Sequence, residues 1–81
     1  MKPLHELMPG EKAYIVDVNN HKLCEKFFEM GVFPGDLVEV QINASGNNQI
    51  TVRINSRTFR IFKKAAEHVM TGAVDKQVCL N

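Results

Sequence analysis

Side chains that could bind a metal ion gather in one short stretch of the chain. His21 and Glu25 stand four residues apart, a spacing that places two side chains on the same face of a helix, and Cys24 lies between them. A protein metal site also needs further ligands at similarly close spacings. The other histidines, His5 and His68, are distant in the sequence and complete no such pattern. We therefore expect these side chains to be exposed polar residues, and we expect no metal site.

The arrangement of polar residues does not indicate catalysis. An enzyme of this kind would need a nucleophile beside a base, or carboxylates placed for acid–base work. The nine acidic residues are scattered along the chain, and no serine or cysteine lies in a recognisable nucleophile motif. Cys24 and Cys79 are far apart and outside any Cys-x-x-Cys pair, so they predict no disulfide framework. We expect a protein that binds a partner, with no catalytic residues and no cofactor.

A basic cluster occupies residues 53–64, where no acidic residue occurs. Its members are Arg53, Arg57, Arg60, Lys63 and Lys64. Such a run is typical of a solvated strand face and the start of a helix, although it could also bind an acidic partner or nucleic acid. Binding of nucleic acid would require aromatic stacking platforms among the charges, and the nearby Phe59 falls on the predicted inward face of its strand.

Length and composition limit the kinds of protein that the chain can form. Its 81 residues suffice for one domain, whose thin core leaves little room for a deep active-site cleft. Apolar residues at 44% and charged residues at 23% are ordinary for a globular protein, and a net charge of +1 gives no overall attraction to nucleic acid or membrane. Neither a signal peptide nor an apolar stretch long enough to cross a bilayer is visible, so we expect a cytoplasmic protein.

The first half of the chain predicts a strand followed by a helix. Residues 12–18 are rich in β-branched and aromatic side chains, and a bulge near Val16-Asp17 would bring Val18 into phase with Ala13 and Ile15. Residues 21–30 then form a helix that Asn19 or Asn20 could cap. Gly31 suits the left-handed conformation that ends many helices.

Phe28 is the residue of this helix whose place is hardest to assign. Leu23, Phe27 and Met30 follow the i, i+4, i+7 spacing of one buried face, and Phe28 points well away from its centre. Phe28 could pack in the core beside an amino-terminal arm that contains Leu4 and Leu7. It could equally be an exposed apolar contact of the kind that marks a partner site.

The second half predicts short strands joined by tight turns. Pro34 and Gly35 occupy the central positions of a type II turn. Residues 37–42 and 49–55 alternate, separated by a loop at 44–48, which predicts that six side chains share one buried face: Val38, Val40, Ile42, Ile50, Val52 and Ile54. A second turn at Asn55-Ser56 leads to a strand at residues 58–62, one helical turn within 63–68 and a short closing strand at 69–70.

These elements predict a mainly β fold. A small sheet of four or five half-buried strands would expose unpaired backbone groups at its edges. Closing the sheet into a barrel removes these edges. The expected fold is a small SH3-like five-stranded barrel with one inserted helix and short terminal helical turns. Residues 1–70 would form the domain, and residues 71–81 a flexible tail.

The sequence resembles the FeoA family over about residues 4–70. The resemblance rests on three segments: Leu4-x-x-Leu7-x-x-Gly10-Glu11-x-Ala13-x-Ile15-x-x-Val18; Met30-Gly31-x-x-Pro34-Gly35-x-x-Val38-x-Val40; and Phe59-Arg60 followed by Ala65-Ala66-x-x-Val69. The Met-Gly-x-x-Pro-Gly element is the most specific part. The chain departs from the family in having no proline in its hairpin loop and in carrying Phe27-Phe28 where leucines are usual.

The resemblance implies a small cytosolic accessory protein of bacterial ferrous iron transport that binds FeoB, a membrane GTPase transporter, and so could be recruited to the inner face of the membrane. For the partner-binding surface we hypothesise Phe28 with Lys22, Glu25 and Glu29 as its rim, whereas Met30, Gly31, Pro34 and Gly35 would be structural. The same barrel forms the C-terminal domain of iron-dependent repressors. The alternatives are therefore a metal-responsive domain of that kind, in a protein linked to iron and transition metal ion binding, or a small barrel that binds nucleic acid.

Overall fold

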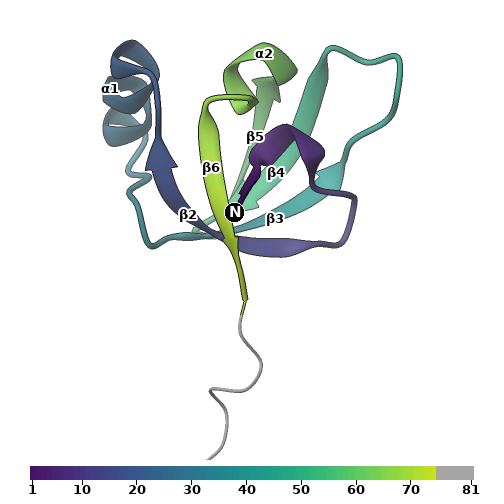
Figure 1. Cartoon of the computed structure of the whole chain (residues 1–81), viewed down its shortest axis with the longest axis horizontal. Helices are drawn as coiled ribbons and strands as arrows, with labels where there is room; N and C mark the ends of the chain where they lie inside the picture. Colours follow the sequence, from purple (N-terminus) through teal and green to yellow (C-terminus); the bar gives the residue numbers. More distant parts are fainter. Residues whose placement is uncertain (75–81) are drawn as a thin grey trace, which may run out of the picture.

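The computed structural model describes residues 1–74, which form one antiparallel sheet with a helix inserted between its strands (Figure 1). The elements in chain order are β1 (Lys2–Pro3), the 3-10 helix η1 (Leu4–Glu6), β2 (Lys12–Val18), α1 (His21–Glu29), β3 (Leu37–Ile42), β4 (Gln49–Ile54), β5 (Arg57–Phe62), α2 (Lys63–Ala66) and β6 (Val69–Ala73). The strand order is β1-β6-β2-β3-β4-β5, so the last strand lies between the first two. The sheet contains the predicted strands and adds the two-residue β1. None of the described helices is long and apolar enough to cross a membrane.

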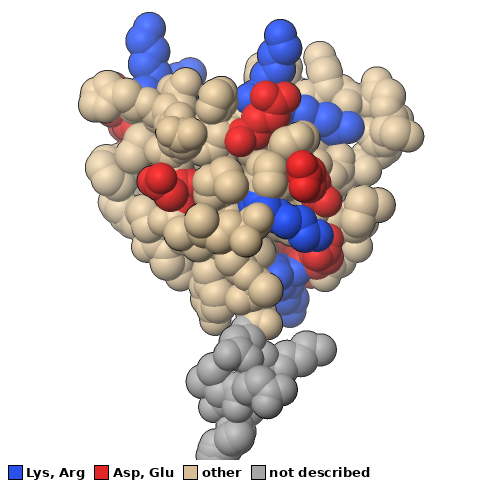
Figure 2. Space-filling view, viewed as in Figure 1, with Lys and Arg blue, Asp and Glu red and all other residues tan. Residues whose placement is uncertain are grey.

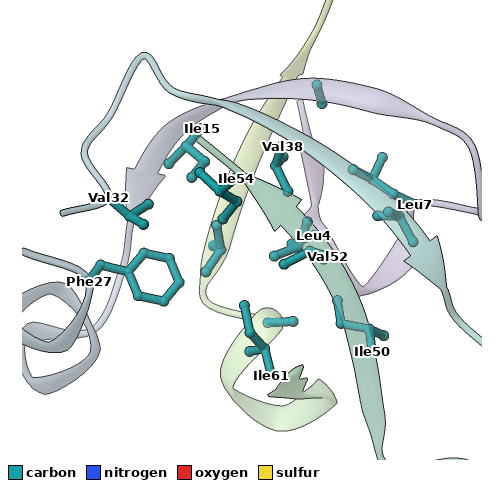
Figure 3. Packing of buried hydrophobic residues seen from close by; sticks show 14 residues of the cluster. Leu4, Leu7, Ile15, Phe27, Val32, Val38, Ile50, Val52, Ile54 and Ile61 are labelled. Carbon is teal, nitrogen blue, oxygen red and sulfur yellow. The ribbon is translucent and has the colours of Figure 1, made fainter. Parts of the chain in front are cut away.

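The core is a single cluster of apolar side chains between the two halves of the curved sheet. Figure 3 shows Phe27 pointing from α1 into this cluster, toward Val32 and the strands. Five of the six side chains predicted on the inner face are fully buried: Val38, Val40, Ile50, Val52 and Ile54. Strict alternation in β3 and β4 therefore produced the expected buried face over most of its length.

Ile42 is the exception, and the prediction that it is buried is wrong. Its side chain is 52% exposed. The pairing of β3 with β4 shifts register between Val40 and Ile42, because a β-bulge inserts an extra residue there. One extra residue reverses the side-chain alternation, so Ile42 turns to solvent.

The local features predicted for β2 and α1 are confirmed. The pairing of β2 with β6 shifts register between Ile15 and Asp17, which is the predicted bulge. At the start of α1 the side chain of Asn20 accepts a hydrogen bond of 3.0 Å from the backbone N–H of Leu23. Gly31, just after the helix, has φ = +78°. The cap and the glycine depend on neighbouring residues alone, and the bulge was visible in the sequence as a break in the alternation of apolar residues.

The two ends of the described chain are held together on the sheet. Leu4 and Leu7 are buried in the core, so the amino-terminal arm docks as expected. The prediction that a tail begins at Thr71 is wrong, because β6 continues to Ala73. The buried Thr71 hydroxyl donates a hydrogen bond of 2.7 Å to the carbonyl of Lys2. The rest of the predicted tail, residues 75–81 with Cys79, lies outside the described residues.

Candidate functional site

Two exposed aromatic rings lie against each other on the surface. Phe28 of α1 is 51% exposed and Phe33, in the loop after the helix, is 48% exposed. Their ring centroids are 5.1 Å apart and the rings are tilted by 36°. This distance lies within the range of favourable aromatic pairs. The structure thus resolves the two alternatives for Phe28: it is a surface residue and does not belong to the core.

Phe33 is held in place by the turn that follows it. Its backbone N–H donates to Oδ2 of Asp36 (2.8 Å), and the N–H of Asp36 donates back to the carbonyl of Phe33 (3.0 Å). The turn is also bonded to β2, since Gly35 N–H donates to the Ile15 carbonyl (2.7 Å) and Ile15 N–H donates to the Asp36 carbonyl (2.9 Å). Gly35 has φ = +99°, as the predicted type II turn requires. Phe33 has no periodic pattern that would assign it a role from the sequence, although its position just before a Pro-Gly turn was a signal.

Met30, Gly31, Pro34 and Gly35 lie in and beside the segment that links Phe28 to Phe33, and side chains of the β4–β5 turn and of β5 bond to this segment. The guanidinium of Arg57 donates a hydrogen bond to the carbonyl of Met30, at the point where α1 ends. Asn55 Nδ2 donates to Asp36 Oδ2 at 3.0 Å, so the β4–β5 turn also holds the loop. Arg57 and Asn55 are positioning residues that sequence reasoning missed, because they lie more than 18 positions away from the residues that they hold.

The predicted rim residues of α1 do not all lie beside the aromatic pair. Glu25 and Glu29 are exposed on the helix, and Glu25 Oε2 lies 3.3 Å from Nε2 of His21. Lys22 is about 120° around the helix from Phe28, at about 100° per residue, and lines a different hollow together with Leu23. By the same measure Glu25 lies about 60° and Glu29 about 100° from Phe28, so Glu25 is the predicted rim residue nearest to Phe28 around the helix, whereas Lys22 and Glu29 share another side of it.

The side chains considered as metal ligands do not converge. Among residues 1–74 no group of three His, Cys, Asp or Glu side chains could hold a metal ion. His21 and Glu25 form their i, i+4 pair on the exposed side of α1, and Cys24 beside them is half-buried. His5 belongs to η1, and His68 lies between α2 and β6.

The basic cluster is divided by its contacts within the molecule. Arg57 is bonded to Met30, and its guanidinium carbon lies 5.5 Å from the ring centroid of Phe59. Lys63 Nζ donates to the carbonyl of Ala44 at 2.9 Å. Phe59 is thus half-buried beside Arg57, and Phe62 is the exposed aromatic ring of β5. This arrangement does not provide the row of stacking platforms that single-stranded nucleic acid prefers.

The curled antiparallel sheet and the helix inserted between its strands define a small SH3-like domain. Comparison with known families identifies it further, since the FeoA domain matches residues 2–71. The chain belongs to the FeoA family. The FeoA family consists of small accessory domains and is not a known enzyme family. Membership in it supports a role in ferrous iron transport.

Solved structures agree with this assignment. The iron uptake regulatory protein FeoA is 30% identical with a TM-score of 0.75, over 88% of this chain and 93% of that chain. Iron(II) transport protein A from Clostridium thermocellum is 32% identical with a TM-score of 0.78, over 91% of this chain and 46% of that chain. A manganese-dependent transcriptional repressor, at 16% identity, has a TM-score of 0.79 over 90% of this chain and 41% of that chain, and it shows the fold alone. Among curated proteins, no sequence matches the chain significantly.

Proposed function

We propose that this protein is a cytoplasmic accessory of ferrous iron transport that binds a FeoB-like membrane GTPase transporter through the Phe28–Phe33 pair. The observation that carries the proposal is the contact between two half-exposed aromatic rings, one of which precedes a hydrogen-bonded turn. Binding at this surface would recruit the protein to the inner face of the membrane.

The physical case rests on the free energy of exposed apolar surface. Each Å² of apolar area that a partner covers contributes about 25 cal/mol. Aromatic side chains with few degrees of freedom are frequent anchors of protein interfaces, and charged neighbours at the rim exclude water from them. Because hydrogen bonds of the 33–36 turn hold the backbone of Phe33, a partner that binds the pair has little backbone to order.

The test measures binding to the transporter in nanodiscs by biolayer interferometry. Phe28→Glu and Phe33→Glu should each weaken the association by about tenfold or more, equivalent to about 1.4 kcal/mol. Both rings are exposed, so the thermal unfolding temperature of either variant should change little. Ile42→Glu is the matched control, because Ile42 is similarly exposed and lies at the end of β3, outside this loop.

The proposed surface would be wrong if both phenylalanine variants folded normally and bound at full strength. It would also be wrong if Ile42→Glu weakened binding as strongly as they do, since the loss would then reflect added charge anywhere on the protein.

A further inference from the structure

A groove with an apolar floor separates α1 from β5 and α2. Two adjoining hollows of about 250 and 260 Å³ form it, and both are lined by Leu23, Lys26 and Ala65. In Figure 1 the two helices stand at the same end of the molecule, with the end of β5 leading into α2. The inner wall of the groove is made by Phe27, Met30 and Ile61. The groove lies on the core-facing side of α1, away from the Phe28–Phe33 pair.

The rim of this groove is basic. Lys22, Lys26 and Arg60 line it, His68 lies at one end, and none of the acidic residues among residues 1–74 lines either hollow. Figure 2 shows Lys and Arg side chains projecting over both α1 and α2 at this end. Within residues 1–74 the ion pairs are Lys2–Glu11 and His21–Glu25, and neither involves a cation of the groove. The groove is thus lined by three cations, in a protein whose net charge is only +1.

One wall of the groove is an open sheet edge. Strand β5 pairs with β4 and, in the described part of the chain, with no other strand. Opposed residues of an antiparallel pair alternate between hydrogen-bonded and non-hydrogen-bonded pairs. The hydrogen bond from the Lys63 N–H to the Asn48 carbonyl (2.8 Å) shows that Lys63 and Asn48 form a hydrogen-bonded pair, and this fixes the alternation along β5. Phe59 and Ile61 therefore direct their backbone groups to β4. The backbone groups of Thr58, Arg60 and Phe62 point the other way, toward the open side.

We propose that this groove binds an extended acidic segment of a partner protein, which adds to β5 as a further strand. An open edge favours an extended ligand over a helix, because only a strand satisfies its row of unpaired N–H and C=O groups. An added strand would lie about 4.8 Å from β5. Its side chains alternate, so apolar ones pack against Leu23, Phe27 and Ile61 while acidic ones face Arg60 and Lys26. This site is separate from the proposed transporter contact and does not depend on it.

The test is an NMR titration of the ¹⁵N-labelled full-length protein with a synthetic peptide. The peptide alternates valine and glutamate and has the six-residue length of β5. The amides of Thr58, Arg60 and Phe62 should shift and become protected from hydrogen exchange. The amides of Phe59 and Ile61 are already bonded to β4, so their protection should not change. Protection that fails to alternate in this way would overturn strand addition.

Charge is tested with matched variants. Lys26→Glu and Arg60→Glu should each weaken binding of the acidic peptide by about tenfold. Arg53→Glu is the control, because Arg53 is an exposed cation of β4 that lines neither hollow. A peptide with lysine in place of glutamate should not bind. Equal binding of both peptides would overturn the proposal, and so would an oligothymidylate that protects the same amides while the acidic peptide has no effect.

Discussion

Asn43 holds the amino-terminal arm on the sheet, and its removal should destabilise the whole domain. The side-chain Nδ2 donates two hydrogen bonds in a partly buried position, to the carbonyl of His5 at 3.0 Å and to that of Leu7 at 2.6 Å. One acceptor, His5, directly follows the buried Leu4, and the other, Leu7, is itself part of the core. In Asn43→Ala the two carbonyls lose these donors while the arm still covers them.

The magnitude follows from the number of bonds. An intramolecular hydrogen bond contributes about 0.5–1.5 kcal/mol net, so the loss of both should cost about 1–3 kcal/mol. For a domain of this size, a loss of about 2 kcal/mol lowers the unfolding temperature by roughly 8–16 °C. Asn43→Asp has the same shape but, when ionised, only accepts hydrogen bonds. It should cost more than Asn43→Ala, because it places a carboxylate against two carbonyl oxygens.

Circular dichroism during thermal and urea unfolding provides the assay. Asn47→Ala is the control, because Asn47 is an exposed residue of the same β3–β4 loop, and the change should stay within about 0.5 kcal/mol. If Asn43→Ala were no less stable than Asn47→Ala, or if Asn43→Asp were as stable as the wild type, the two hydrogen bonds would not hold the arm.

Three further predictions concern the core, the turn and iron. Val52→Ala should cost about 1–3 kcal/mol in urea unfolding, because Val52 is fully buried and the change leaves a cavity; an unchanged midpoint would contradict this. Gly35→Ala should cost about 1–2 kcal/mol through its positive φ alone, since no atom lies within 4 Å of the added Cβ, and a neutral effect in the same assay would refute the strain. Since no ligand group converges within residues 1–74, anaerobic calorimetry should find Fe²⁺ binding no stronger than at a weak surface site; a tight stoichiometric site abolished by His21→Ala would overturn that expectation.

The candidate surface could be predicted only in part from the sequence. Phe28 stood out because helical periodicity placed it off the buried face, and the structure does expose it. Phe33 has no periodic context, and its contact with Phe28 depends on how the intervening turn docks on β2 through Ile15. The groove was likewise beyond sequence reasoning, since it joins α1 to Arg60 and Ala65, which are more than 30 residues away along the chain.

The sequence by itself determined the features that neighbouring residues set. These include the cap at Asn20, the positive φ of Gly35 and the alternation that buries Val38 and Val40, because each needs only the local backbone and a period of two or 3.6 residues. Tertiary structure decided where that periodicity breaks and where strands end. The bulge before Ile42 is a property of the pairing with β4, and β6 extends beyond Met70 because β2 pairs with it as far as Ala73 and β1 also pairs with Thr71. Such partners are distant in the sequence and meet only after the chain has closed on itself.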